Sequence, residues 1–129
     1  MKTDYLNLYS NLNDFQKEIV NATRDWVNLH VRPNIEDSFI LGKPLVLKRE
    51  LAELGAFGPI FPQEYGGLDF DYISYGLMMK ELEKGDSSVR VTSSIQTSLV
   101  MFAIYSFGST EQKKKYLPAL ANGSIVGSF

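Results

Sequence analysis

The fold of this protein is decided by one long stretch, residues 87–107, with the sequence SSVRVTSSIQTSLVMFAIYSF. Its second half predicts an α-helix, because Ile95, Leu99 and Phe102 recur at helical spacing and share one face. Other apolar residues widen that face, and a helix with so much apolar surface usually lies at the centre of a core. The first half instead carries small hydroxyl-bearing side chains where leucine would be expected. We therefore expect an all-α domain built around this helix.

Further helices are predicted on both sides of this stretch. Residues able to cap their N-termini are Asn13, Asp71, Ser87 or Ser88, and Ser109. Asn13 and Ser109 are each followed three residues later by Gln, which is the pattern of a capping box. Apolar side chains expected on the buried faces are Phe15, Ile19, Ala22, Trp26 and Leu29 in the first helix, and Ile73, Leu77, Met78 and Leu82 in the helix before residue 87.

Two segments interrupt the helical pattern. Residues 58–68 contain Gly-Pro, Phe-Pro and Gly-Gly pairs, which predict a loop, and the aromatic residues in that loop indicate that it packs against the core. Residues 125–129, with the sequence IVGSF, are typical of a β-strand. Since a lone strand cannot satisfy its backbone hydrogen bonds, we expect residues 1–123 to form an α-helical domain and residues 124–129 to begin a truncated β-domain.

Composition excludes several classes of site. The 129 residues include 13 Lys+Arg and 15 Asp+Glu, which gives a net charge of −2, with no Cys and a single His, His30. Disulfides, thiol nucleophiles, iron–sulfur clusters and Cys-bound zinc are therefore excluded, and we expect no metal site. An isoelectric point near 5.4 without a basic block argues against nucleic acid binding. The longest apolar run, residues 99–105, is too short to span a membrane, and the first residues resemble no signal or transit peptide, so we expect a cytoplasmic protein.

One polar region stands out between two long apolar helices. Arg90 and Ser94 are four residues apart, so they share a face of the helix that follows the polar connection beginning at Glu83. One interpretation is a solvated first helical turn whose Ser and Thr side chains satisfy backbone groups. The other is the polar floor of a pocket, in which Arg90 holds an anionic ligand group. The residues alone leave both interpretations open.

Four ordered segments resemble the acyl-CoA dehydrogenase family. They are FPQEYGGLD at residues 61–69, ELE followed by DSS at residues 81–88, GSTEQK and KYLPALANG at residues 108–123, and GSF at residues 127–129. The resemblance implies the N-terminal α-domain of a three-domain, FAD-dependent enzyme, which is usually a homotetramer and passes electrons to electron-transferring flavoprotein. In this family a Glu of the C-terminal domain removes the α-proton of the acyl-CoA while the β-hydride passes to the flavin. The resemblance therefore implies no catalytic residue in this chain, and Phe129 as its flavin contact.

Within this family the chain is most similar to the glutaryl-CoA dehydrogenases. Arg90, with Ser94 four residues later and Glu83 seven residues earlier, matches the residues that surround the distal carboxylate of the substrate in those enzymes. Members usually have Ser directly after this Arg, where the present chain has Val91. The resemblance implies oxidation and decarboxylation of glutaryl-CoA to crotonyl-CoA, in the cytoplasm or, in a eukaryote, in the mitochondrial matrix. The alternatives are a dehydrogenase of another short-chain acyl-CoA and a helical interaction module without enzymatic activity.

Overall fold

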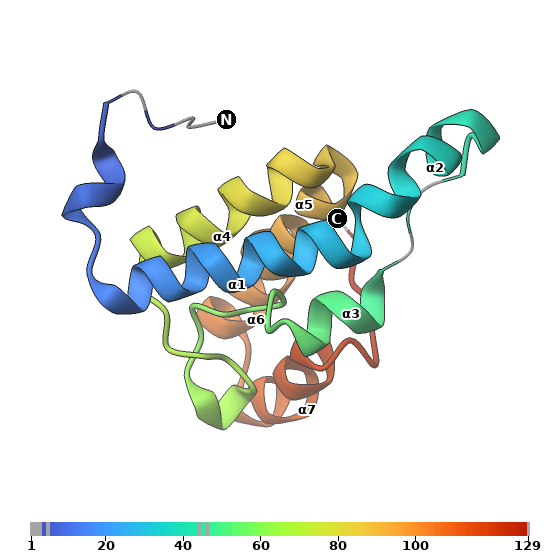
Figure 1. Cartoon of the computed structure of the whole chain (residues 1–129). Coiled ribbons are helices and arrows are strands. Elements are labelled where there is room, and N and C mark those ends of the chain that lie inside the picture. Colours follow the sequence, from blue (N-terminus) through green and yellow to red (C-terminus); the bar gives the residue numbers. More distant parts are fainter. Residues whose placement is uncertain (1–3, 5, 44, 46, 129) are drawn as a thin grey trace.

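A computed structural model describes residues 4, 6–43, 45 and 47–128, which form an all-α domain (Figure 1). These residues contain no strand. The helices are, in chain order, η1 (Leu8–Asn11), α1 (Asp14–His30), η2 (Arg32–Asn34), α2 (Ile35–Leu41), α3 (Lys48–Glu53), η3 (Gln63–Tyr65), α4 (Tyr72–Gly85), α5 (Ser87–Ser94), η4 (Ile95–Met101), α6 (Phe102–Phe107) and α7 (Thr110–Ala121). The segment η4 is a π-helix, whereas η1, η2 and η3 are 3₁₀ turns. The predicted fold class is confirmed.

Helices α1 and α4 pack along each other, and α5 packs on α4 (Figure 1). The close approach of α1 and α4 depends on Gly85, because a Cβ atom there would lie 2.6 Å from Cγ1 of Val27. From α5 the chain continues through η4 into α6, and α7 packs against α6 and η3. The long helix predicted at residues 87–107 is therefore confirmed, with a π-helical segment in its middle.

Two apolar clusters form the core. The first joins α1, α3, α4 and α5 through Ile19, Val27, Val31, Leu51, Ala56, Phe57, Met78, Met79, Leu82 and Val89. The second joins η4 and α7 to the loop before η3 through Phe61, Met101, Leu117, Leu120 and Ala121. Phe61 is 2% exposed, so the loop at residues 58–68 packs against the core as its aromatic residues predict.

Side-chain caps fix where several helices begin. The capping boxes predicted at Asn13 and Ser109 are confirmed. Asp71 begins α4, because its carboxylate accepts a hydrogen bond from the backbone N–H of Ser74 at 2.7 Å. Each cap satisfies a backbone donor that the first turn of a helix leaves without a partner.

The junction between α4 and α5 is formed by Asp86. The predicted cap of α5 at Ser87 or Ser88 is wrong, because the Asp86 carboxylate accepts hydrogen bonds from the N–H groups of Ser88 and Val89 at 2.9 and 3.1 Å. Asp86 has an extended backbone, with φ −159° and ψ 132°, and also ends α4. A junction of one residue therefore brings the last turn of α4 beside the first turn of α5.

The buried face of α1 differs from the predicted one. Its buried side chains are Gln16, Ile19, Val20, Thr23 and Val27. Of the predicted stripe, Phe15 and Leu29 are 51% and 69% exposed, Ala22 is exposed and Trp26 is half-buried. At Gly85 the close approach is filled by Val27, which belongs to this neighbouring stripe that α1 turns toward α4. Ile73 of α4, also predicted to be buried, is 62% exposed.

The apolar face predicted for residues 95–104 is only partly buried. Leu99 and Phe102 are 41% and 43% exposed, whereas Gln96 is almost fully buried. Gln96 is tolerated inside because its Nε2 donates a hydrogen bond to the backbone carbonyl of Leu120 at 2.9 Å. The helical residues 95–104 therefore bury a partly polar face, and Leu99 and Phe102 leave apolar surface exposed.

Residues 125–128 form no strand, although their sequence is typical of one. A strand requires a neighbouring strand for its hydrogen bonds, and the described residues contain none. Instead, the Gln96 side chain donates to the carbonyl of Ile125 and accepts from the N–H of Gly127, both at 3.0 Å. One side chain therefore holds this irregular segment against η4.

Candidate functional site

Glu83, Arg90 and Ser94 lie together where α4 ends and α5 begins. Nε of Arg90 lies 2.6 Å from Oε2 of Glu83, and Nη1 of Arg90 donates to Oγ of Ser94 at 3.3 Å. Glu83 comes from α4 and the other two from α5, so the short junction at Asp86 makes the contact possible. The structure therefore brings together three of the residues that the sequence singled out.

The Glu83 carboxylate is firmly held in its ionised form. The side chains of Arg90 and Glu83 are 33% and 45% exposed. The hydrogen bond from Arg90, followed by one from the Ser87 hydroxyl at 2.7 Å, holds the pKa of the Glu83 carboxyl below its ordinary value. Glu83 is therefore charged at neutral pH and orients Arg90, rather than exchanging protons with a ligand.

Arg90 retains hydrogen-bonding capacity beyond these contacts. A guanidinium has five N–H donors, of which Glu83 and Ser94 each engage one. The Ser94 hydroxyl donates its hydrogen to the carbonyl of Val91 at 3.1 Å. A carboxylate that approaches this group therefore meets free Arg90 donors first, and gains a bond from Ser94 only when that hydroxyl rotates away from Val91.

Val91 and Phe129 are the other two residues that the sequence singled out. Val91 is half-buried, and its backbone carbonyl serves Ser94, while its side chain has no hydrogen-bonding group to offer a ligand. Phe129 lies outside the described residues. The polar contacts of the candidate site therefore come from Glu83, Arg90 and Ser94.

Tyr75 on α4, which the sequence did not single out, lies close enough to Arg90 for the positive charge of Arg90 to act on its hydroxyl. Burial raises the pKa of the Tyr75 hydroxyl, whereas the nearby Thr97 side chain and the positive charge of Arg90 act in the opposite direction. Tyr75 also packs against the first apolar cluster. No sequence pattern links Tyr75 to Arg90, because their proximity arises from the packing of α4 on the helical run that starts with α5.

The buried hydroxyl groups that follow Arg90 serve the fold. Oγ of Ser93 donates to the carbonyl of Ala56 at 2.6 Å, and the N–H of Gly58 donates to Oγ1 of Thr97 at 2.9 Å. These side chains satisfy backbone groups as one interpretation predicted, but they are buried and not solvated, whereas Arg90 and Ser94 stay partly exposed. The π-helix η4 begins directly after Ser94, and such segments frequently occur at functional sites.

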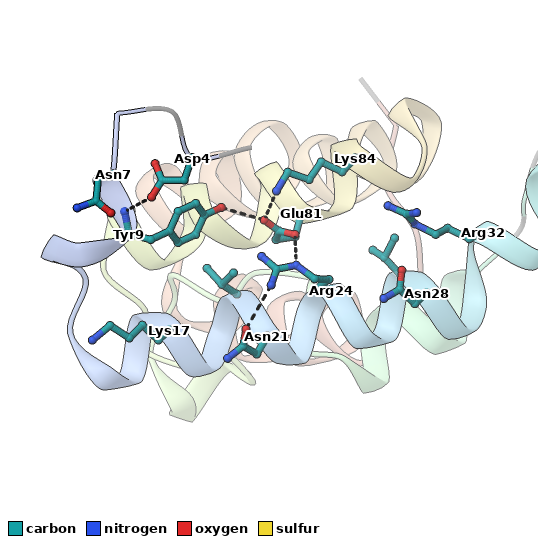
Figure 2. Close-up of a pocket in the computed structure, with 12 residues that line it drawn as sticks. Asp4, Asn7, Tyr9, Lys17, Asn21, Arg24, Asn28, Arg32, Glu81 and Lys84 are labelled. Carbon is teal, nitrogen blue, oxygen red and sulfur yellow. Dashed lines mark hydrogen bonds and ion pairs between the residues drawn. The ribbon is translucent and has the colours of Figure 1, made fainter. Parts of the chain in front are cut away.

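Two surface hollows lie elsewhere on the domain. The larger has a volume of about 1010 Å³ and lies between α1, α4 and the N-terminal segment (Figure 2). The smaller, of about 410 Å³, lies between α6 and α7.

In the part of the chain that the structure describes, no group of three or more His, Asp or Glu side chains could hold a metal ion. Over the same residues, no helix combines the length and the apolar character needed to cross a membrane.

Sequence comparison assigns most of the chain to one protein family. The model of the acyl-CoA dehydrogenase N-terminal domain matches residues 13–124. The glutaryl-CoA dehydrogenase of Desulfococcus multivorans is 31% identical over 130 residues, which cover 95% of this chain and 32% of that protein. The short-chain specific acyl-CoA dehydrogenase of Megasphaera elsdenii is 34% identical over 125 residues, which cover 92% of this chain and 32% of that protein.

Structural comparison agrees with this assignment. The crystal structure of glutaryl-CoA dehydrogenase from Mycobacterium smegmatis matches with a TM-score of 0.89 and 36% identity, over 95% of this chain and 32% of that one. A structure of such an enzyme from the same organism in complex with FADH2 matches with a TM-score of 0.88 and 37% identity, over 94% of this chain and 31% of that one. The chain thus spans about a third of these relatives. It belongs to the acyl-CoA dehydrogenase family, in which it corresponds to the N-terminal domain.

Proposed function

We propose that this chain forms the substrate-selecting N-terminal domain of an FAD-dependent dehydrogenase that oxidises and decarboxylates glutaryl-CoA. The observation that carries the proposal is the position of Arg90, which Glu83 orients and which contacts Ser94 on a partly exposed surface. In this proposal residues 1–123 are the α-domain and residues 124–129 begin a β-domain. The proton-abstracting Glu belongs to the C-terminal domain of such an enzyme.

Selection for a dicarboxylic acyl group follows from its charge. The distal carboxylate loses water on entering an acyl pocket, which is unfavourable unless a cation compensates it. Arg90 compensates it through charge-assisted hydrogen bonds, which are about twice as strong as neutral ones. The planar guanidinium also fixes the direction of the carboxylate. An uncharged acyl chain gains nothing from Arg90, so the residue discriminates between the two classes of substrate.

A second candidate is a dehydrogenase of an uncharged short-chain acyl-CoA such as butyryl-CoA. The observation that favours it is the pairing of Glu83 with Arg90 at 2.6 Å, which already neutralises the guanidinium. In that case the ion pair serves only to join α4 to α5. The similarity to the short-chain specific enzyme of Megasphaera elsdenii is consistent with this candidate.

FAD is the proposed cofactor, and it supplies the hydride acceptor when bound. The FADH2 complex of the Mycobacterium smegmatis relative supports this proposal. The contact expected from this chain is Phe129, which lies outside the described residues. We also propose, from the family resemblance, a homotetramer that electron-transferring flavoprotein reoxidises.

Substitution of Arg90 by Ala separates the two candidate substrates. In the intact dehydrogenase that contains this chain, kcat/KM for glutaryl-CoA should fall by about 30-fold to several thousand-fold, the range for loss of one partner of a desolvated charge pair. For butyryl-CoA it should stay within about tenfold, because that substrate has no distal carboxylate to lose. Initial rates with an artificial electron acceptor measure both kcat/KM values. Detection of crotonyl-CoA and CO2 as products shows that glutaryl-CoA is both oxidised and decarboxylated.

Arg49→Ala is the matched control for this experiment. Arg49 also pairs with a carboxylate, Glu53, at 2.8 Å, but its side chain is 84% exposed on α3. Its loss should leave the preference between glutaryl-CoA and butyryl-CoA unchanged. Equal losses on both substrates in Arg90→Ala, or no loss on either, would refute glutaryl-CoA selection and favour the second candidate.

A further inference from the structure

The larger hollow lies on the side of α4 that faces α1, away from the candidate site. Glu81 extends from α4 toward α1, where it contacts Arg24 (Figure 2). Glu83, two residues later on α4, instead contacts Arg90 on α5. The N-terminal segment closes a third side of the hollow with Tyr9. Nothing in the proposed dehydrogenase function uses this space of about 1010 Å³.

Polar side chains of α1 and η2 form one stripe along the hollow. The members of this stripe, each three or four residues after the previous one, are Lys17, Asn21, Arg24, Asn28 and Arg32. Helix α4 contributes Lys84 from the opposite side. Figure 2 shows Arg24, Asn28 and Arg32 extending from α1 and η2 into the space that Lys84 borders. Arg24 and Lys84 approach each other at Glu81, and Arg32 borders the same hollow.

The hollow carries positive charge, although the chain as a whole is acidic. Its lining contains four cationic side chains, Lys17, Arg24, Arg32 and Lys84, against two acidic ones, Asp4 and Glu81. The lining side chains by themselves have a net charge of +2, whereas the whole chain has −2; Lys17 is in addition paired with Asp14 of α1 at 3.4 Å. Cationic side chains are therefore concentrated on this surface, although the net charge of the whole protein is negative.

Both acidic side chains of the lining are already engaged by the protein. Glu81 is 2% exposed and accepts hydrogen bonds from Lys84 at 2.6 Å, from Arg24 at 3.1 Å and from the Tyr9 hydroxyl at 3.1 Å. The Asp4 carboxylate accepts hydrogen bonds from two backbone N–H groups of η1, each at 2.8 Å. Glu81 therefore orients Arg24 and Lys84 without using all of their donors.

Arg32 is the most available cation of the hollow. It is exposed, and no acidic side chain of the described residues forms an ion pair with it. Its position beyond the end of α1 makes it independent of the core. A ligand therefore meets Arg32 without first having to break a contact of the fold.

We propose that this hollow binds a small phosphate monoester, with the phosphoryl group between Arg24, Arg32 and Lys84. A phosphoryl group carries a charge of about −1.5 to −2 near neutral pH, which matches the +2 of the lining. Guanidinium groups bind such oxygens in pairs. The volume is at the upper end of the range for small-molecule sites, so an organic group fits beside the phosphate, against Tyr9 and Val27.

Titration of the 129-residue chain with AMP at low ionic strength tests this proposal. Backbone amide chemical shifts should saturate with AMP, and the shifts should be confined to α1, α4 and the N-terminal segment. Adenosine, which lacks the phosphate, should not bind, and inorganic phosphate, which lacks the organic group, should bind more weakly than AMP. Added salt should weaken binding of AMP because the attraction is electrostatic.

Arg32→Gln is the informative variant, because an exposed side chain outside the core can be replaced without unfolding the chain. It should weaken AMP binding by about tenfold or more, as expected for loss of a charge-assisted hydrogen bond. Arg49→Gln removes the same charge from α3 and should leave AMP binding unchanged. The proposal is overturned when AMP does not saturate, when the two variants behave alike, or when inorganic phosphate binds as tightly as AMP.

Discussion

Glu81 allows the sharpest test of how this fold is held together. Glu81→Gln keeps the shape of the side chain and removes its charge, which leaves Arg24 and Lys84 without their shared counter-ion. Breaking a fully buried ion pair in this way costs about 3–5 kcal/mol. The Arg24 and Lys84 side chains are 44% and 31% exposed and can be hydrated, so we expect a loss of about 2 kcal/mol in the free energy of unfolding.

The dependence of this loss on pH gives an independent signature. Burial by itself raises the pKa of the Glu81 carboxyl, but hydrogen bonds from Lys84 and Arg24 outweigh burial and lower the pKa below its ordinary value. A carboxyl with a lowered pKa contributes stability that is fully present above the pKa of the unfolded chain, roughly 4.3. That stability is lost as the pH falls through the lower pKa of the folded state. The difference between the two proteins should therefore be constant near neutral pH and shrink below about pH 4.

Urea unfolding of both proteins at pH 7 and at acid pH, followed by the fluorescence of the single Trp, Trp26, measures this difference. Glu53→Gln is the control, because it breaks an exposed pair with Arg49 at a similar distance of 2.8 Å, and exposed pairs contribute little. The reasoning is refuted if Glu81→Gln costs no more than Glu53→Gln, or if its cost is the same at pH 7 and at pH values below the ordinary pKa of Glu.

Three further predictions follow from the packing. Gly85→Ala should destabilise the domain by about 1–3 kcal/mol despite the better helix propensity of Ala, because the new Cβ would meet Val27 at 2.6 Å; thermal unfolding measures it, and an unchanged or raised Tm would contradict the close approach of α1 and α4. Gln96→Ala should speed amide hydrogen exchange in residues 120–127, which Gln96 holds through three hydrogen bonds; unchanged exchange there would show that these bonds are dispensable. The 129-residue chain alone should bind FAD weakly, since one residue of it is expected to contact the flavin; calorimetric titration showing micromolar or tighter affinity would refute that view.

Interactions between near neighbours in the chain could be predicted from the sequence. The caps at Asn13, Asp71 and Ser109 were all recognisable, because a cap and its backbone partner lie within three residues. The wrong prediction of the α5 cap also concerned a choice between neighbouring residues. Asp86 and the two serines after it can all cap a helix, and only the extended backbone of Asp86 decides between them.

The candidate site was predictable for a similar reason. Ser94 lies four residues after Arg90 on one helix face, and Glu83 lies seven residues before it across a junction of one residue. Tyr75 was not predictable, because its proximity to Arg90 depends on how α4 is rotated against the next helix. The same applies to α1, where two neighbouring stripes are apolar enough to be buried and the close approach at Gly85 selects one of them.

The sequence by itself determined the all-α class, the starts of α1, α4 and α7, and the grouping of Glu83, Arg90 and Ser94. Only the tertiary structure decided the cluster around Glu81, whose partners Arg24 and Tyr9 stand 57 and 72 positions earlier in the chain. The physical reason is the range of the interactions. Helix hydrogen bonds and caps depend on neighbours within about four residues, so periodicity predicts them. Contacts between helices depend on their relative rotation and spacing, which the packing of the whole core sets.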